Sequence, residues 1–71
     1  MKIEFDREVD ALYIQFHSGK VKQSLKIREG IVVDIAKDGR IFGIEILDAS
    51  QRIPVSQIAQ VNLNFPLAKA S

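Results

Sequence analysis

GIVVDIAKDGRIFGIEIL, residues 30–47, consists of two alternating apolar runs on either side of Asp38-Gly39. An Asp-Gly pair between such runs is a strong signal for a β-hairpin, because both residues tolerate the positive φ of a type I′ turn. A two-residue turn here pairs Lys37 with Arg40 and places three apolar pairs on one face: Ile35 with Phe42, Val33 with Ile44, and Ile31 with Ile46. The turn and the period-two pattern therefore predict the same register.

Ser18-Gly19 separates a second pair of strand-like runs, residues 11–17 and 20–27. A two-residue loop at this point brings apolar residues together on one face: Phe16 with Val21, and Leu12 with Leu25. The same register sets Ile14 opposite Gln23, so we expect either a solvated strand edge or a bulge there. The sequence therefore predicts a second hairpin within residues 11–27.

The loop between these two hairpins has to keep the apolar side chains of both hairpins on the same face of the sheet. A two-residue turn at Glu29-Gly30 would move Val33 to the opposite face from Leu25, because side chains alternate along a strand. An odd loop is therefore required. We expect residues 28–30 to form a three-residue loop with Gly30 at positive φ, which pairs Ile27 with Ile31 and Leu25 with Val33.

The N-terminal residues complete the predicted sheet, since residues 2–5 alternate and residues 6–10 form a polar connection. The predicted fold is mainly β (α+β): an antiparallel meander of about five strands over residues 1–50, followed in the same single domain by residues 51–71. One face carries apolar residues from every strand: Ile3, Phe5, Leu12, Ile14, Phe16, Leu25, Ile27, Ile31, Val33, Ile35, Phe42, Ile44 and Ile46. An apolar surface of this extent has to be covered.

The C-terminal segment, residues 51–71, is the local candidate for that cover. Ser50 is suited to cap a turn, and Pro54 fits the first turn of a short helix that ends near Gln60. The stretch VNLNF, residues 61–65, alternates and equally fits a last short strand. Both alternatives stay open for residues 54–65. Since either element is small for a five-stranded face, we expect a second subunit to contribute to the cover.

Composition points to the same need for a partner. A chain of 71 residues has a marginal core, which disulfides, metals or oligomerisation usually supplement. The chain has no cysteine and one histidine, so neither a disulfide nor a zinc site of several histidines can form within it. We therefore expect a homodimer or a complex with a second small protein, with no cofactor and no metal. The net charge of +1 provides no field that attracts nucleic acid.

No stretch approaches the roughly 20 apolar residues of a membrane-spanning helix, and the N-terminus does not have the pattern of a signal peptide. We therefore expect a cytoplasmic protein without a membrane partner.

Three motifs occur within residues 1–50: D-x-E-x-D-A-L-Y-I at 6–14, G-I-V-V-D at 30–34, and D-G-R-I-F-G-I-E-I-L-D-A-S at 38–50. These motifs resemble the YuzE-like family of small prokaryotic proteins, known as domain of unknown function 2283. Arg7 stands where such families usually have proline. The family is uncharacterised as a rule, but some members are encoded beside small toxin genes. The resemblance therefore implies a partner-binding, antitoxin-like role, and it does not extend to residues 51–71.

The outer face of the predicted sheet gathers polar residues. The hairpin of residues 30–47 pairs Asp34 with Gly43 and Val32 with Glu45, and the other registers add Tyr13 and Ser24 to the first row and Lys26 to the second. We expect an interaction surface formed by Tyr13, Ser24, Lys26, Val32, Asp34, Ile41, Gly43 and Glu45. Gly43 has no side chain and leaves room for a ligand or another backbone.

Other chemistry has less support in the sequence. Tyr13, Lys26, Asp34 and Glu45 can in principle exchange protons, but a flat sheet face offers no desolvated cleft, so we assign no catalytic residue. A small enzyme with its site on the outer sheet face or in a dimer cleft stays as the second alternative. The glycines at positions 19, 30 and 39 (Gly19, Gly30, Gly39) are explained by turns. The acidic residues of 6–10 are expected to serve turn and cap chemistry. A basic stripe, formed by Lys20, Lys22, Lys26 and Arg28, leaves weak nucleic-acid binding as a third alternative.

Overall fold

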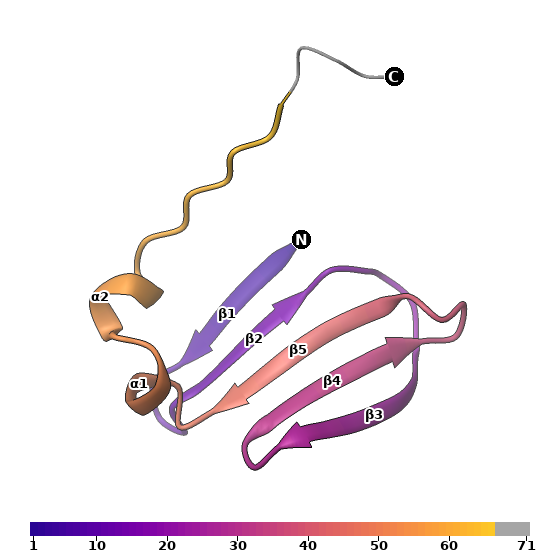
Figure 1. Cartoon of the computed structure of the whole chain (residues 1–71), viewed down its shortest axis with the longest axis horizontal. Helices are drawn as coiled ribbons and strands as arrows, with labels where there is room; N and C mark the ends of the chain where they lie inside the picture. Colours follow the sequence, from indigo (N-terminus) through magenta and orange to yellow (C-terminus); the bar gives the residue numbers. More distant parts are fainter. Residues whose placement is uncertain (67–71) are drawn as a thin grey trace.

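The computed structural model describes residues 1–66, which form one five-stranded antiparallel sheet and two short helices (Figure 1). The strands are β1 (Lys2–Asp6), β2 (Ala11–Gln15), β3 (Val21–Arg28), β4 (Ile31–Ala36) and β5 (Ile41–Leu47), and the helices are α1 (Ala49–Arg52) and α2 (Val55–Ile58). The predicted fold class, a mainly β antiparallel sheet with a short C-terminal helix, is confirmed. No helix of the described residues is long and apolar enough to cross a membrane.

The strand order is β1-β2-β5-β4-β3, so β2 pairs with β5 and not with β3. The hairpin predicted at Ser18-Gly19 is therefore wrong. The reason is that β5 provides apolar partners for both inward-facing residues of β2. Pairing with β5 places Leu12 opposite Ile46 and Ile14 opposite Ile44, whereas the predicted hairpin placed Ile14 opposite a glutamine. Residues 16–20 instead carry the chain from β2 past the ends of β5 and β4 to the far edge (Figure 1).

The hairpin of β4 and β5 has the predicted register over most of its length, with Asp34 opposite Gly43 and Val33 opposite Ile44. Its turn differs from the prediction. The Ala36 carbonyl accepts the amide of Gly39 at 3.0 Å, and the Ala36 amide donates to Arg40. The loop therefore has three residues, with Gly39 at φ 90° and no positive φ at Asp38.

The Asp38 carboxylate explains why the type I′ turn is not formed. It accepts the amide of Arg40 at 3.0 Å, a local bond that holds the turn in its observed conformation. The extra loop residue is compensated by a register shift that pairs Ile35 with Ile41 and leaves Phe42 in a bulge. The predicted pairing of Ile35 with Phe42 is therefore wrong.

The connection between β3 and β4 keeps their apolar side chains on one face of the sheet, but it does so without the predicted three-residue loop. Leu25 pairs with Val33, and Gly30 has φ 82°, as expected. However, Arg28 pairs with Ile31, so the loop has two residues and the register shift lies between Lys26 and Arg28. The predicted pairing of Ile27 with Ile31 is wrong, because a bulge supplies the odd residue that a longer loop was expected to supply.

The loop between β1 and β2 holds α1 in place. The Asp10 carboxylate accepts the Ser50 amide at 3.0 Å and the Ser50 hydroxyl at 2.7 Å, and the Asp10 carbonyl accepts the amide of Ala49. Ala49 is fully buried. Asp6 accepts the amide of Glu8 at 2.9 Å, so the turn chemistry predicted for the acidic loop is confirmed. Ser50 lies inside α1, and Asp48 occupies the N-cap position.

Residues 51–66, the part of the C-terminal segment that the structure describes, lie at one end of the sheet and do not cover either face (Figure 1). Pro54 is the N-cap of α2, which ends at Ile58, close to the predicted helix. Residues 61–65 are neither helix nor strand and extend away from the sheet. The rest of the predicted tail, residues 67–71, lies outside the described residues.

Asp10→Ala is expected to lower the free energy of unfolding by about 1–3 kcal/mol, because two hydrogen bonds to Ser50 are lost and alanine tolerates the positive φ of 55° poorly. Urea denaturation followed by circular dichroism measures the change. Glu8→Ala, in the same turn, is the control and should stay within about 0.5 kcal/mol of the native chain. Equal stability of the two variants would show that Asp10 does not hold α1.

Candidate functional site

Two rows of apolar side chains cross one side of the sheet, which we call the apolar face. The first row runs across all five strands and consists of Ile3, Ile14, Ile44, Val33 and Leu25. The second row runs across four strands and consists of Phe5, Leu12, Ile46 and Ile31. Because paired residues of neighbouring strands lie on the same side of a sheet, these nine side chains form one continuous apolar surface.

The apolar face is largely open in a single chain. Leu12 is the one member of its two rows that is buried, while Ile3 is 40% and Leu25 is 41% exposed. The whole chain exposes 5931 Å². A globular monomer of 8.0 kDa exposes about 4,450 Å², so this chain exposes about 1,500 Å² more than a closed monomer of its size. Among residues 1–66, the exposed side chains of the apolar face and of the extended residues 61–65 both contribute to this excess.

The opposite side of the sheet carries a hydroxyl–carboxylate network, the tyrosine cluster, formed by Tyr13, Ser24 and Asp34. The Tyr13 hydroxyl donates to one carboxylate oxygen of Asp34 at 2.9 Å, and the Ser24 hydroxyl donates to the other at 2.6 Å. Three strands contribute, since Tyr13 lies on β2, Ser24 on β3 and Asp34 on β4. The network therefore ties β2 to β4 across the intervening strand β5.

Gly43 allows the Tyr13 side chain to cross β5. A Cβ atom at this position would lie 2.7 Å from the Tyr13 Cζ and 2.8 Å from the Ile14 carbonyl oxygen, both closer than real Cβ contacts. The space that the sequence predicted above Gly43 is thus filled by the chain's own tyrosine ring. The absence of a side chain at Gly43 leaves room for the Tyr13 ring to lie over the middle of β5.

The structure brings together part of the predicted interaction surface. Asp34 lies between Ser24 and Gly43, and Val32 lies between Lys26 and Glu45, as expected. Tyr13 pairs with Glu45 in the second of these rows, so the predicted placement of Tyr13 beside Ser24 in the first row is wrong, although its hydroxyl reaches Asp34.

Two further members of the predicted surface lie apart from the tyrosine cluster. The Lys26 ammonium lies 2.9 Å from the carboxylate of Glu29, and Ile41 sits at the start of β5. Of the predicted turn glycines, Gly19, Gly30 and Gly39 all have positive φ.

Burial and the neighbouring carboxylate hold the Tyr13 hydroxyl in its protonated form. Desolvation is the largest cause, followed by the hydrogen bond to Asp34 and the negative charges of Asp34 and Glu45, and together they raise the pKa of Tyr13 from 10.0 to about 12. At neutral pH the hydroxyl is therefore a hydrogen-bond donor. A hydroxyl with so high a pKa is a poor general base, because a general base has to be deprotonated at the working pH before it can accept a proton.

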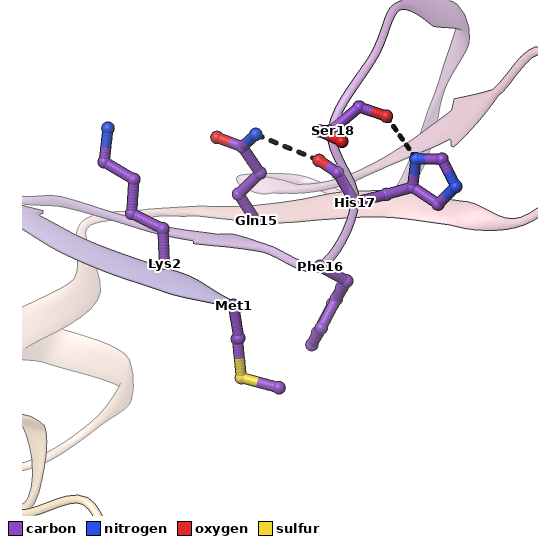
Figure 2. A pocket seen from close by; sticks show the side chains of 6 residues that line it. All are labelled: Met1, Lys2, Gln15, Phe16, His17 and Ser18. Atoms are coloured by element: carbon purple, nitrogen blue, oxygen red, sulfur yellow. Dashed lines mark hydrogen bonds between the residues drawn. The ribbon is translucent and has the colours of Figure 1, made fainter.

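An open hollow of about 330 Å³ lies at the end of β1 and β2 (Figure 2). Figure 2 shows that Lys2 and Gln15 point to one side of this sheet end, whereas Met1 and Phe16 point to the other. The lining side chains therefore do not converge on a common point, as those of a small-molecule site do.

His17 adjoins this hollow and lies near the turn of β4 and β5. Its Nε2 is 3.5 Å from the carboxylate of Asp38. The amide of Arg40 is the main cause that lowers the pKa of Asp38, and the proximity of His17 adds to it. Among residues 1–66, no three His, Cys, Asp or Glu side chains are grouped so that they could hold a metal ion.

Arg52 is a structural residue that the sequence did not single out. Its Nε donates to the Leu47 carbonyl and its Nη2 to the Glu29 carbonyl, both at 2.8 Å. It thus joins α1 to the end of β5 and to the loop between β3 and β4. No spacing in the sequence indicates this role, because both acceptors are backbone carbonyls, which every residue has, and Glu29 lies 23 residues from Arg52 along the chain.

Comparison with known protein families assigns the part of the chain that forms the sheet to one family. The model of the family described as protein of unknown function (DUF2283) matches residues 2–50, which span all five strands and the start of α1. The chain belongs to this family. The match confirms the resemblance seen in the sequence, and it ends where the C-terminal segment begins. No solved structure matches the chain.

Two curated archaeal proteins are similar to the chain. One, from Methanosarcina mazei, is named a putative hypoxanthine phosphoribosyltransferase and is 33% identical over 64 residues, which are 90% of this chain and 51% of that protein. The other, the uncharacterised protein MJ0789 from Methanocaldococcus jannaschii, is 35% identical over 57 residues, which are 80% of this chain and 48% of that protein. The chain thus spans about half the length of these relatives.

Because the chain has one tyrosine and no tryptophan, the near-ultraviolet absorbance of tyrosinate reports Tyr13 alone. We expect a pKa of about 12 in the native chain and a lower value in Asp34→Asn, since the amide does not repel the phenolate charge. The folded state keeps the Tyr13 proton to higher pH than the unfolded state. The free energy of unfolding should therefore fall as the pH rises from 10 towards 12, and this fall should be absent in Tyr13→Phe. An unchanged pKa in Asp34→Asn contradicts the tyrosine cluster.

Gly43→Ala is expected to destabilise the fold by about 1–3 kcal/mol, because the new Cβ meets the Tyr13 ring and the Ile14 carbonyl. The displaced ring should also leave Asp34, so the pKa of Tyr13 should fall towards 10. Thermal unfolding and the tyrosinate titration measure the two effects. In a Tyr13→Ala background the same substitution should cost less, and full additivity of the two substitutions would contradict a contact between position 43 and the ring.

Proposed function

We propose that this chain is a protein-interaction module that binds its partner through the apolar face. The observation that carries the proposal is the exposure of two apolar rows that run across the sheet, over which residues 1–66 form no second layer. Continuous apolar surfaces of this kind mark contact sites in soluble proteins. The two short helices lie beside the sheet and leave the face accessible (Figure 1).

The size of the exposed surface supports the proposal. A stable protein–protein interface removes about 800 Å² from each partner. The chain exposes about 1,500 Å² more than a closed monomer of 8.0 kDa, which is sufficient for one such interface. The buried apolar side chains among residues 1–66 are four, Leu12, Ala36, Phe42 and Ala49, so a partner would supply much of the core that one chain lacks.

An antitoxin-like role is the more specific form of this proposal. It draws on the family resemblance, in which some members are encoded beside small toxin genes. An antitoxin of this kind would bind a small toxin in a stoichiometric complex through the apolar face. The name of the Methanosarcina relative refers to a protein about twice as long as the matched segment, and the proposal does not carry a phosphoribosyltransferase activity over to this chain.

Catalysis and nucleic-acid binding have less support than an interaction module. The protonated Tyr13 hydroxyl and the ion pair of Lys26 with Glu29 occupy two of the groups on which an acid–base site would depend. The basic stripe is interrupted, because Lys22 lies in a register shift of β3 and Lys26 is paired. Nucleic-acid binding would require an affinity that falls steeply with salt and in Lys22→Ala combined with Lys26→Ala.

A matched pair of leucines tests which face binds. Leu25 on the apolar face and Leu47 on the opposite face are 41% and 40% exposed. Leu25→Asp is expected to abolish the complex, because it places a charge in an apolar contact, whereas Leu47→Asp should retain it. Sedimentation gives the mass of the native chain and of each variant, and affinity capture from the native host reveals a second protein.

A folding control accompanies this test. Circular dichroism establishes that each variant retains the sheet, which is expected because both side chains already contact water. A partner that is lost in Leu25→Asp and kept in Leu47→Asp supports the proposal, and a small ribonuclease among such partners supports the antitoxin form. Loss in Leu47→Asp alone would assign binding to the outer surface, and a native chain that stays at 8.0 kDa and captures nothing would overturn the proposal.

A further inference from the structure

We infer that a second copy of this chain binds at the β1 edge of the sheet, and that residues 61–65 of each copy form a strand on the β1 edge of the other. This inference rests on the proposed interaction function and names the partner and the element that binds. The segment VNLNF has the alternation of a half-buried strand. In the structure it is extended and pairs with no strand of its own chain (Figure 1).

The exposure of this segment is unusual for apolar side chains. Val61, Leu63 and Phe65 are 67%, 75% and 70% exposed, and the two asparagines lie between them. In a strand, the three apolar residues would lie on one side and Asn62 and Asn64 on the other. Such a strand is suited to extend a sheet that has one apolar and one polar face.

The β1 edge has this two-sided character. Ile3 and Phe5 belong to the apolar face, whereas Lys2, Glu4 and Asp6 alternate with them. The pairing of β1 with β2 is regular along its whole length. An added strand that sets Asn62 beside Glu4, and Val61 and Leu63 beside Phe5 and Ile3, would continue the apolar face with its apolar residues and the polar face with its asparagines.

The other edge, β3, is a poor docking site for a strand. Its pairing with β4 is irregular at two places, between Val21 and Gln23 and between Lys26 and Arg28. Bulges on an edge strand hinder the addition of another strand, because they interrupt the row of free backbone groups. The regular edge, β1, is therefore the better template.

The position of α2 allows an exchange between two copies. An open hollow beside Phe5 and Arg7 is lined by Val55, Ile58 and Ala59, so the segment leaves α2 close to the end of β1. From there it extends past the sheet and remains unpaired (Figure 1). The surplus of about 1,500 Å² in exposed surface exceeds the roughly 800 Å² that each partner of a stable dimer contributes. A two-fold exchange of the segments would bury both the segments and the β1 edges.

Charge placement within the segment tests the inference in the full chain. Leu63→Asp combined with Phe65→Asp should raise the dissociation constant of the dimer roughly tenfold or more, because two apolar contacts are lost. Asn62→Asp combined with Asn64→Asp adds the same charge to the polar side and should change it roughly twofold at most. Sedimentation equilibrium measures both, and folding of the monomer is not at risk because the segment is exposed. Equal effects of the two pairs would overturn the inference.

Cross-linking identifies the edge and the chain that binds. The native chain has no cysteine, so each introduced cysteine is unique. Glu4 on β1 and Lys26 on β3 lie at the two ends of one row across the sheet. An Asn62→Cys chain mixed with a Glu4→Cys chain should form a mixed disulfide dimer, and the same chain mixed with Lys26→Cys should form much less.

The outcomes separate this inference from the proposed function. A disulfide that forms only when both cysteines are in one chain would show that the segment pairs within its own chain, and the inference would be wrong. A dimer that is lost in Leu25→Asp but forms no Asn62–Glu4 disulfide would retain the proposed function and overturn the strand exchange. The strand exchange would also be overturned if the purified native chain sediments as a monomer of 8.0 kDa.

Discussion

Strand β2 pairs with β5 along its whole length, and this pairing joins the β1–β2 hairpin to the β3–β4–β5 meander. The two rows of the apolar face exist because Leu12 and Ile14 meet Ile46 and Ile44 at this junction. The same junction brings Tyr13 beside Gly43 and within hydrogen-bond distance of Asp34 on the next strand. Without it, the chain would consist of a two-stranded hairpin, which is marginally stable in water, and a separate three-stranded meander.

Local patterns in the sequence predicted much of this sheet. The alternation of residues 30–47 gave the correct partners for Val32, Val33 and Asp34, because one face of the hairpin is apolar and the other is polar. The need for one extra residue between β3 and β4 was also correct. Its location in a bulge was not predictable, since a longer loop and a bulge restore the same parity and differ only in local backbone geometry.

Long-range pairing was the part that the sequence did not reveal. The apolar side of β2 is compatible with β3 and with β5, and proximity along the chain favoured β3. The mismatch of Ile14 with Gln23 was the one signal against that choice, and β5 removes it by providing Ile44. The tyrosine cluster was anticipated in its members but not in its geometry, because Tyr13 reaches Asp34 over Gly43 rather than from a neighbouring strand. The contacts of Arg52 with backbone carbonyls left no trace in residue spacing.

The same architecture supports the proposal that a partner covers the apolar face. A five-stranded sheet with two four-residue helices has one layer, whereas stable domains pack at least two. The family match covers the sheet and ends at α1, so the elements that build the apolar face are those shared by the family. In the proposed assembly the sheet, which the family model matches, provides the contact surface, and residues 61–65 add a contact at the β1 edge.

The accessibility of leucine and isoleucine methyl groups to a dissolved paramagnetic agent, measured by nuclear magnetic resonance, tests this account most directly. In a single chain, Ile3, Leu25 and Leu47 are almost equally exposed, at 40%, 41% and 40%. The account predicts that the methyl groups of Ile3 and Leu25 are protected from the agent in the assembled protein, while those of Leu47 on the opposite face remain accessible. Equal accessibility of all three residues in a protein with an intact sheet would contradict the claim that the apolar face is the contact surface.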